Sequence, residues 1–368
     1  MQQAPETPSG RIVSIQVCRG LAALLVVLVH LHTIETRYCA TDHLRLFEHG
    51  GLGVDLFFVI SGVVIASVTA GKFGHPHDAG VFLYHRLARI LPIFWIYTTI
   101  TLIARYLKPL AGIGDNGRSV NLLASYLLIP THRSMLLLQG WTLSYELYFY
   151  FIFFLLLLLV PERLAPWLLA LWGVAVIALK LYIGLSPFPI AQLLISPSVL
   201  EFLAGCVLFH IYRRSRLHPS IGVLLLITSL LWIAAVILYT AQAHPGHPEW
   251  IVAGPWRRPL LYGTFATLFL LGAIELERTS LIRYLPILSS IGDWSYSIYL
   301  SHALVLQLIG RLVFRLLPHP ASILLITLIS LPSVILVGNL SYTYLERPLL
   351  HLLYKPAPPS QSPAKQPA

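Results

Sequence analysis

Charged side chains are scarce in this sequence. Asp, Glu, Lys and Arg make up 11% of the 368 residues, whereas a soluble domain carries about 25%. Hydrophobic residues reach 57%, and the mean hydropathy is +0.75. So little charge cannot cover a water-facing surface. The composition therefore excludes a soluble enzyme, a disordered protein and a nucleic-acid-binding module, and the net charge of +10 is better explained by basic loops that fix a membrane orientation.

Cysteine is also rare. The three cysteines, Cys18, Cys39 and Cys206, are odd in number and far apart, so they offer neither a disulfide framework nor a zinc pattern. The histidines of HPHD at 75–78 and of HPGHPEW at 244–250 lack helical ligand spacing and a cysteine partner. We therefore expect no metal site.

Long apolar runs are what the sequence has instead. A helix that crosses a bilayer needs about 20 mostly apolar residues. The sequence predicts ten such helices, at 14–34, 51–71, 91–107, 141–160, 167–184, 197–212, 221–241, 258–275, 291–314 and 322–344. The segment 120–130 is apolar but short, and we expect an interfacial or re-entrant helix there, with a true span as the alternative. The fold class is all-α, a polytopic membrane helix bundle.

The two ends of the chain differ from this body. Residues 1–13 lack the basic start and the cleavage site of a signal peptide, so we expect them to stay as an N-terminal segment. Residues 355–368 are polar and rich in proline, which predicts disorder. Residues 14–354 then form one membrane domain. An even number of spans, ten, places both termini on the same side of the membrane. The loop cations between 213 and 216 favour the cytoplasmic side for that loop and for both termini, which puts the Arg pair at 257–258 outside.

Ionisable residues inside spans are informative, because burying them costs several kcal/mol unless they are paired or hydrated. Arg19 and His30 are eleven residues apart in the first span, which places them on one helix face and roughly 16 Å apart along the axis. Asp55 lies near the start of the second span, and Glu146 lies early in the fourth. Structural explanations remain open: snorkelling for Arg19, an interfacial hydrogen bond for His30 and the helix dipole for Asp55.

A second set of candidates lies at helix ends. Arg86 and Arg89 share a face at positions i and i+3, just before the third predicted span. Two guanidinium groups at this spacing suit a phosphate-bearing ligand, although a lipid-headgroup anchor has the same pattern. Trp141 opens the fourth span, and Tyr299 and His302 lie one turn apart in the ninth. These three are candidate substrate-binding residues, with an aromatic interfacial belt as the alternative.

Seven strings carry a resemblance to a known family. They are RGLAALLVVLVH at 19–30, GVDLFFVISG at 53–62, the Arg-x-x-Arg of 86–89 before Ile-x-Pro, WTLSYELYFY at 141–150, EFLAGC at 201–206, SYSIYLSH at 295–302 and LERPL at 345–349. In this order they resemble the family-3 membrane acyltransferases, multi-pass proteins that O-acylate carbohydrates and some small natural products. The resemblance extends over 11–354. Thr142 stands where the family usually has Ser, and His85 where it often has another Arg.

The resemblance implies the substrates. The donor would be acetyl-CoA or another acyl-CoA presented from the cytoplasm, with its phosphates bound by Arg86 and Arg89. The acceptor would be a hydroxyl group of a carbohydrate or glycolipid. We therefore expect acyl-CoA, this acceptor and membrane lipids as partners, no nucleic acid and no metal, in a bacterial inner membrane. The identity of the acceptor and the length of the acyl chain stay open.

Catalytic roles follow as hypotheses. His30 would be the general base for the acceptor hydroxyl, oriented by Asp55 or Glu146, and Arg19 would stabilise developing negative charge or hold the donor. Direct transfer is the first hypothesis, and an acyl-enzyme through His30 or Ser61 is the second. Intramembrane charges also mark transporters, so a flippase-like exporter of a glycan or acyl group is the alternative function. No internal repeat of the kind many carriers contain is visible.

Overall fold

The computed structural model describes residues 12–38, 42–107, 119–243, 254–278, 285–316 and 322–354. The expected Pro-rich tail 355–368, the loop 244–250, Cys39 and nearly all of the N-terminal segment 1–13 lie outside these residues.

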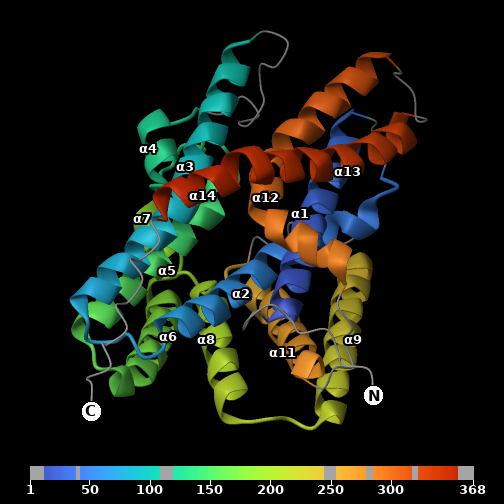
Figure 1. Ribbon diagram of the computed structural model, residues 1–368. Coiled ribbons are helices and arrows are strands. Elements are labelled where there is room, and N and C mark those ends of the chain that lie inside the picture. Colours follow the sequence, from blue (N-terminus) through green and yellow to red (C-terminus); the bar gives the residue numbers. More distant parts are fainter. Residues whose placement is uncertain are drawn as a thin grey trace, which may run out of the picture.

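The described chain is a bundle of helices, and no strand occurs within it (Figure 1). Its ten long helices are α1 (Val13–Tyr38), α2 (Leu52–Thr69), α3 (Pro76–Tyr106), α5 (Gly140–Leu159), α6 (Ala165–Ile183), α8 (Val199–Arg214), α9 (Pro219–Ala243), α11 (Thr264–Arg278), α12 (Pro286–Leu316) and α13 (Ser322–Ser341). Shorter elements are η1 (Arg45–Gly51), α4 (Leu122–Leu127), η3 (Glu162–Leu164), α7 (Pro189–Leu194), the π-helical η4 (Pro259–Gly263) and η5 (Tyr342–Glu346), and α14 (Arg347–Leu353). Over the described residues, ten helical segments are long and apolar enough to cross a membrane. The predicted fold class is confirmed.

The third span begins earlier than expected, whereas the segment 120–130 forms a short helix and not a span, as expected. The third span was expected at 91–107, but α3 begins at Pro76, a position in the first helical turn where proline is favourable. Arg86 and Arg89 are therefore inside the helix and not before it. The apolar segment 120–130 forms only α4: the Asn121 side chain accepts from the Ala124 amide at 3.1 Å, and Leu128 ends the helix in the left-handed conformation.

Small residues let the central helices approach one another. The backbones of α2 and α8 meet at Gly62 and Gly205, where a Cβ on either glycine would collide with the other helix. An added Cβ at Gly50 or Gly53 would meet the backbone of α1. These glycines therefore permit close helix packing, whereas Gly51 has open space around it.

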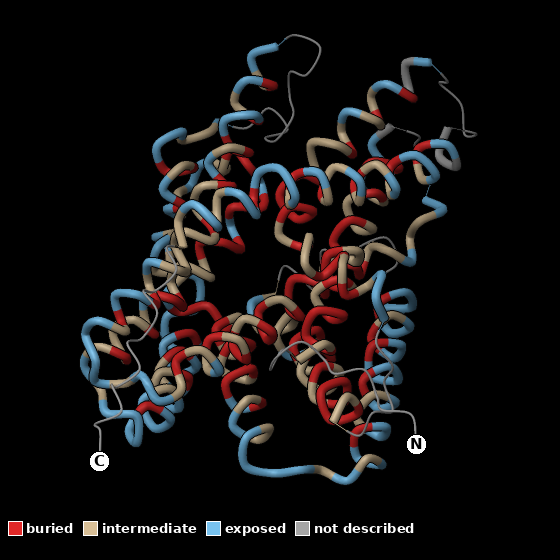
Figure 2. The backbone as a smooth tube through the Cα atoms, viewed as in Figure 1, coloured by how far each residue is buried: buried red, intermediate tan, exposed pale blue. Residues whose placement is uncertain are grey.

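Buried residues gather on the facing sides of the helices, and exposed residues cover their outer sides (Figure 2). The outer side is apolar: Trp167 and Leu171 of α6 and Leu231 of α9 are all exposed. A surface of this kind suits lipid and not water. The interior between α1, α2, α3, α5 and α12 is where the polar side chains converge.

Candidate functional site

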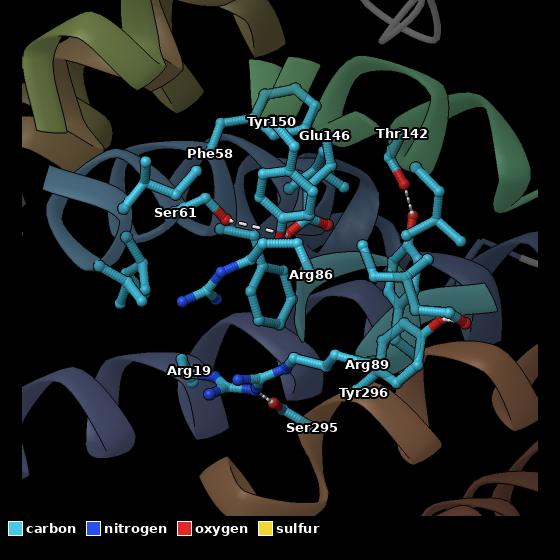
Figure 3. A pocket seen from close by; sticks show the side chains of 18 residues that line it. Arg19, Phe58, Ser61, Arg86, Arg89, Thr142, Glu146, Tyr150, Ser295 and Tyr296 are labelled. Carbon is cyan, nitrogen blue, oxygen red and sulfur yellow. Dashed lines mark hydrogen bonds between the residues drawn. The ribbon is translucent and has the colours of Figure 1, made fainter. Parts of the chain in front are cut away.

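A cavity of about 100 Å³ lies between α1, α2, α3, α5 and α12 (Figure 3). Three arginines line it: Arg19 from α1, and Arg86 and Arg89 from adjacent turns of α3. Glu146 of α5 is the only carboxylate among the lining residues. We call this space the arginine cavity. Glu346 lies outside the lining but interacts electrostatically with Arg19 and Arg89. The three guanidinium groups direct hydrogen-bond donors at one space, which makes it a candidate site for an anion.

Arg86 has hydrogen-bonding capacity to spare. Its Nε atom is buried and has no hydrogen-bond partner. The guanidinium group lies 5.7 Å from the ring centre of Phe82 and 5.8 Å from that of Tyr150, which fixes its position without using its donors. Across the cavity, the Arg19 side chain donates to the hydroxyl group of Ser295 at 2.9 Å. A buried donor without a partner is unfavourable unless a ligand fills the role.

Glu146 is held by two hydroxyl groups. Ser61 of α2 donates to it at 3.4 Å, and Tyr150, one turn further along α5, also donates to it. All three residues line the arginine cavity (Figure 3). Glu146 therefore faces the cavity and the Ser61 hydroxyl, and not the ring of His30.

His30 lies beyond this cavity, against His302. The two rings are 4.8 Å apart in a T-shaped arrangement. The Nδ1 atom of His30 is 2.8 Å from the carbonyl oxygen of Val26. A carbonyl oxygen can only accept, so Nδ1 carries the hydrogen and Nε2 of the neutral ring keeps its lone pair. The backbone of α1 thus sets the tautomer that a general base needs.

Asp55 is paired elsewhere. Arg258 donates from Nε and Nη2 to the two carboxylate oxygens of Asp55, both at 2.9 Å, and from Nη2 to the carbonyl oxygen of Gly51 at 2.9 Å. The guanidinium group also lies 5.4 Å from the ring centre of Trp141. The expected pairing of Asp55 or Glu146 with His30 is thus replaced by pairs with other residues. Arg258, which the sequence placed among the loop cations, is the partner of Asp55.

Tyr299 joins the arginine cavity to the histidines. Its hydroxyl group is 2.6 Å from Thr142 Oγ1, and its ring is 5.8 Å from that of His302. Thr142 and Tyr299 both line the arginine cavity. Trp141, in contrast, packs against Arg258 and Tyr145. Of the three candidate substrate-binding residues, Tyr299 lines the arginine cavity, His302 contacts His30, and Trp141 lies with the ion pair.

A second cavity, of about 80 Å³, lies on the other side of these residues. Its lining includes His30, Thr101, Gln139 and Gln307. We call it the histidine cavity. The glutamines were not expected from the sequence, because neither Gln139, just before α5, nor Gln307, within α12, belongs to a distinctive pattern.

The sequence also missed three other polar residues. Tyr150 and Tyr296 line the arginine cavity, and the carboxylate of Glu346 accepts from Ser297 at 2.6 Å. Two of them could have been found from the sequence. Tyr150 follows Glu146 by four residues, one helical turn, and Glu346 is the acidic residue of LERPL. In the part of the chain that the structure describes, no three His, Cys, Asp or Glu side chains form a group that could hold a metal ion.

Comparison with known proteins gives matches over most of the chain. A family model described as an acyltransferase domain matches residues 12–338. The exopolysaccharide production protein ExoZ of Rhizobium meliloti is 29% identical over 316 residues, which cover 83% of this chain and 90% of that protein. Acyltransferase MdmB of Streptomyces mycarofaciens is 28% identical over 96% of this chain and 95% of its own length. No solved structure matches.

Proposed function

The chain belongs to the acyltransferase-3 family, and from this premise we propose that it moves an acyl group, acetyl in the first instance, from cytoplasmic acyl-CoA to a hydroxyl group of a carbohydrate or glycolipid. It is a multi-pass membrane acyltransferase for groups other than aminoacyl groups. The carbohydrate acceptor is supported by the relative whose name refers to exopolysaccharide production. We place the protein in a bacterial plasma membrane with both termini in the cytoplasm.

The observation that carries the donor assignment is the arginine cavity. Coenzyme A carries several phosphate groups on a long, thin arm. Arg86 and Arg89 point into one cavity from one face of α3, and the buried Nε of Arg86 has a donor to spare. Arginine pairs with phosphate oxygens through two parallel hydrogen bonds, so these residues fit a polyphosphate better than a neutral ligand. Arg19 is placed to hold the same anion from α1.

His30 is our candidate for the general base. Its Nε2 lone pair would take the proton of the acceptor hydroxyl while the oxygen attacks the thioester carbonyl carbon. The carbon–sulfur bond then breaks, and the departing thiolate receives the proton from His30. The products are an ester and free CoA, so atoms and charge balance. An acyl-enzyme through Ser61 is the second route, because that hydroxyl already donates to Glu146 in the arginine cavity.

Substitution of His30 tests this function. We expect His30→Ala to lower acyl transfer from radiolabelled acetyl-CoA by about 10²–10⁴-fold, the usual contribution of a positioned base, while CoA binding stays unchanged. The measurement uses purified protein in lipid nanodiscs with a panel of glycans, after the membrane level of the variant has been checked. Normal transfer by the variant would remove His30 from the mechanism. Movement of glycan across liposomes without acylation would favour the exporter.

A further inference from the structure

The histidine cavity contains hydrogen-bond acceptors that no residue in the described part of the chain satisfies. The Oε1 atoms of Gln139 and Gln307 are both buried and have no hydrogen-bond partner. Both residues line this cavity together with His30. Leaving a buried acceptor without a donor is unfavourable, so two of them beside one cavity point to a ligand that supplies donors.

The orientation of the Gln139 amide is fixed by its neighbour. Gln139 Nε2 is 3.3 Å from His302 Nε2, and His302 Nδ1 is 3.2 Å from the carbonyl oxygen of Ile298. That carbonyl requires a hydrogen on Nδ1, so in the neutral ring Nε2 is an acceptor. Only the NH₂ group of Gln139 can face it, because the amide oxygen would repel its lone pair. The Gln139 oxygen is therefore left for a ligand.

The cavity also contains a third acceptor. The Nδ1 hydrogen of His30 is used by Val26, which leaves its Nε2 as a lone pair. Two amide oxygens and one basic nitrogen form a set that accepts hydrogen bonds and carries no formal charge. Such a set suits a ligand with several hydroxyl groups. Arg37 also lines the cavity, and this cation has an interaction of its own within the protein.

The two cavities lie at different heights along the same helices. Arg19 and His30 are separated by eleven residues of α1, roughly 16 Å along the helix. Helix α3 repeats the arrangement, with Arg89 in the arginine cavity and Thr101 in the histidine cavity. The hydrogen bond between Thr142 and Tyr299 lies at the edge of the arginine cavity next to His302. The bundle thus offers two separate cavities for two substrates, and His30 lines the second of them.

We infer that the histidine cavity is the binding site of the acceptor sugar, where Gln139 and Gln307 accept hydrogen bonds from its hydroxyl groups beside the reacting hydroxyl at His30. The two glutamines are specificity-determining residues. The inference rests on the proposed acyl transfer, because it assigns the second substrate of that reaction.

Sugar binding to the full-length protein in lipid nanodiscs tests the inference. The probes are the methyl glycosides of glucose, galactose, mannose and rhamnose, and binding is measured by saturation-transfer NMR. We expect at least one glycoside to bind, and Gln307→Met to weaken that binding by about three- to tenfold, since one neutral hydrogen bond is lost. Gln307→Glu keeps an oxygen at the same position and should retain more affinity than the methionine variant.

Two controls separate ligand contact from structural damage. Leu308→Met changes the residue next to Gln307 on α12, which is exposed and does not line the cavity, and should leave glycoside binding unchanged. Deoxy analogues of the bound glycoside give a second readout. Removing the hydroxyl that Gln307 contacts should weaken binding to the unaltered protein and leave binding to Gln307→Met unchanged, a pattern that misfolding does not produce.

The glycoside measurements can support or overturn the sugar site. The inference is overturned if none of the four glycosides binds the unaltered protein, or if Gln307→Met binds as tightly as the unaltered protein. Transfer from labelled acetyl-CoA, measured on the same samples, keeps the two proposals apart. Sugar binding that depends on Gln307 without any acylation contradicts the proposed function alone, and acylation with an unchanged acceptor KM in Gln307→Met contradicts the sugar site alone.

Discussion

Two sets of arginines inside the described bundle contrast with each other: Arg258, paired with Asp55, and the three arginines of the arginine cavity. In the pair, both carboxylate oxygens accept from one guanidinium group, and a backbone carbonyl and the face of Trp141 engage the rest of it. In the cavity, three arginines face a single carboxylate, and the buried Nε of Arg86 has no partner.

The difference lies in how completely each charge is satisfied. Asp55 is 0% exposed, so its neutralisation by Arg258 is what makes its burial tolerable. The arginine cavity keeps a buried donor without a partner and open space beside it. We therefore interpret the paired arginine as part of the framework and the cavity arginines as ligand-binding. The following changes test that division, from the largest expected effect to the smallest.

Breaking the ion pair should have the largest effect on stability. Asp55→Ala leaves the buried Arg258 guanidinium without its hydrogen-bonded carboxylate and with Glu201 as the remaining nearby acid. We expect a loss of about 3 kcal/mol in the free energy of unfolding, the lower end of the cost of breaking a buried pair. Thermal unfolding of the purified protein and its level in membranes measure this loss. Glu162→Ala is the matched control, because that carboxylate binds the Gly71 amide on an exposed surface. Equal stability of the two variants would show that the buried pair is no part of the framework.

Neutralising the cavity arginines should affect binding and not stability. We expect Arg86→Met with Arg89→Met to weaken CoA binding by tenfold or more, since a hydrogen bond to a charged group contributes about 1.5–3 kcal/mol. The unfolding temperature should fall less than in Asp55→Ala, because neither side chain is held, within the described residues, by a two-point ion pair like that of Arg258. Calorimetry with CoA gives the affinity, and Arg213→Met, an exposed arginine on α8, is the control. Unchanged affinity would make these residues anchors of the framework, like Arg258.

Removing the single carboxylate of the cavity should act in the opposite direction on binding. Glu146→Gln raises the net positive charge around the site, so CoA affinity should increase, by an amount on the order of 1 kcal/mol. If Glu146 also takes part in the reaction, the rate of acyl transfer should fall while CoA affinity rises. The two measurements together therefore separate its effect on binding from its effect on turnover. Weaker CoA binding in this variant would contradict the electrostatic description of the cavity.

The hydrogen bond at the edge of the cavity should contribute least. Thr142→Val keeps the shape of the side chain and removes its hydroxyl group from Tyr299, with an expected loss of about 1 kcal/mol in stability. Thr142→Ser retains the hydroxyl group and should change stability by less than about 0.5 kcal/mol. Denaturation of both variants in the same detergent measures the difference, and equal losses would mean that packing of the methyl group dominates.

The sequence predicted the framework well and the pairing of side chains poorly. The ten spans followed from runs of apolar residues, which is a local property, and Arg86 with Arg89 followed from helical spacing. The wrong start of the third span came from reading hydropathy alone, because α3 begins in a polar segment with Pro76. The partner of Asp55 lies 203 residues away in the chain, and no local pattern indicates that Arg258 would reach it.

The sequence by itself determined a membrane-spanning helical bundle, because apolar length decides which segments leave water. It also determined that Arg19 and His30 share a helix face, because both lie on one regular helix. Only the tertiary structure decided which polar side chains meet: Asp55 with Arg258, Glu146 with Ser61, and His30 with His302. These contacts depend on how far each helix is shifted and rotated against its neighbours. Packing between distant segments sets that shift, and the order of residues within a single helix does not encode it.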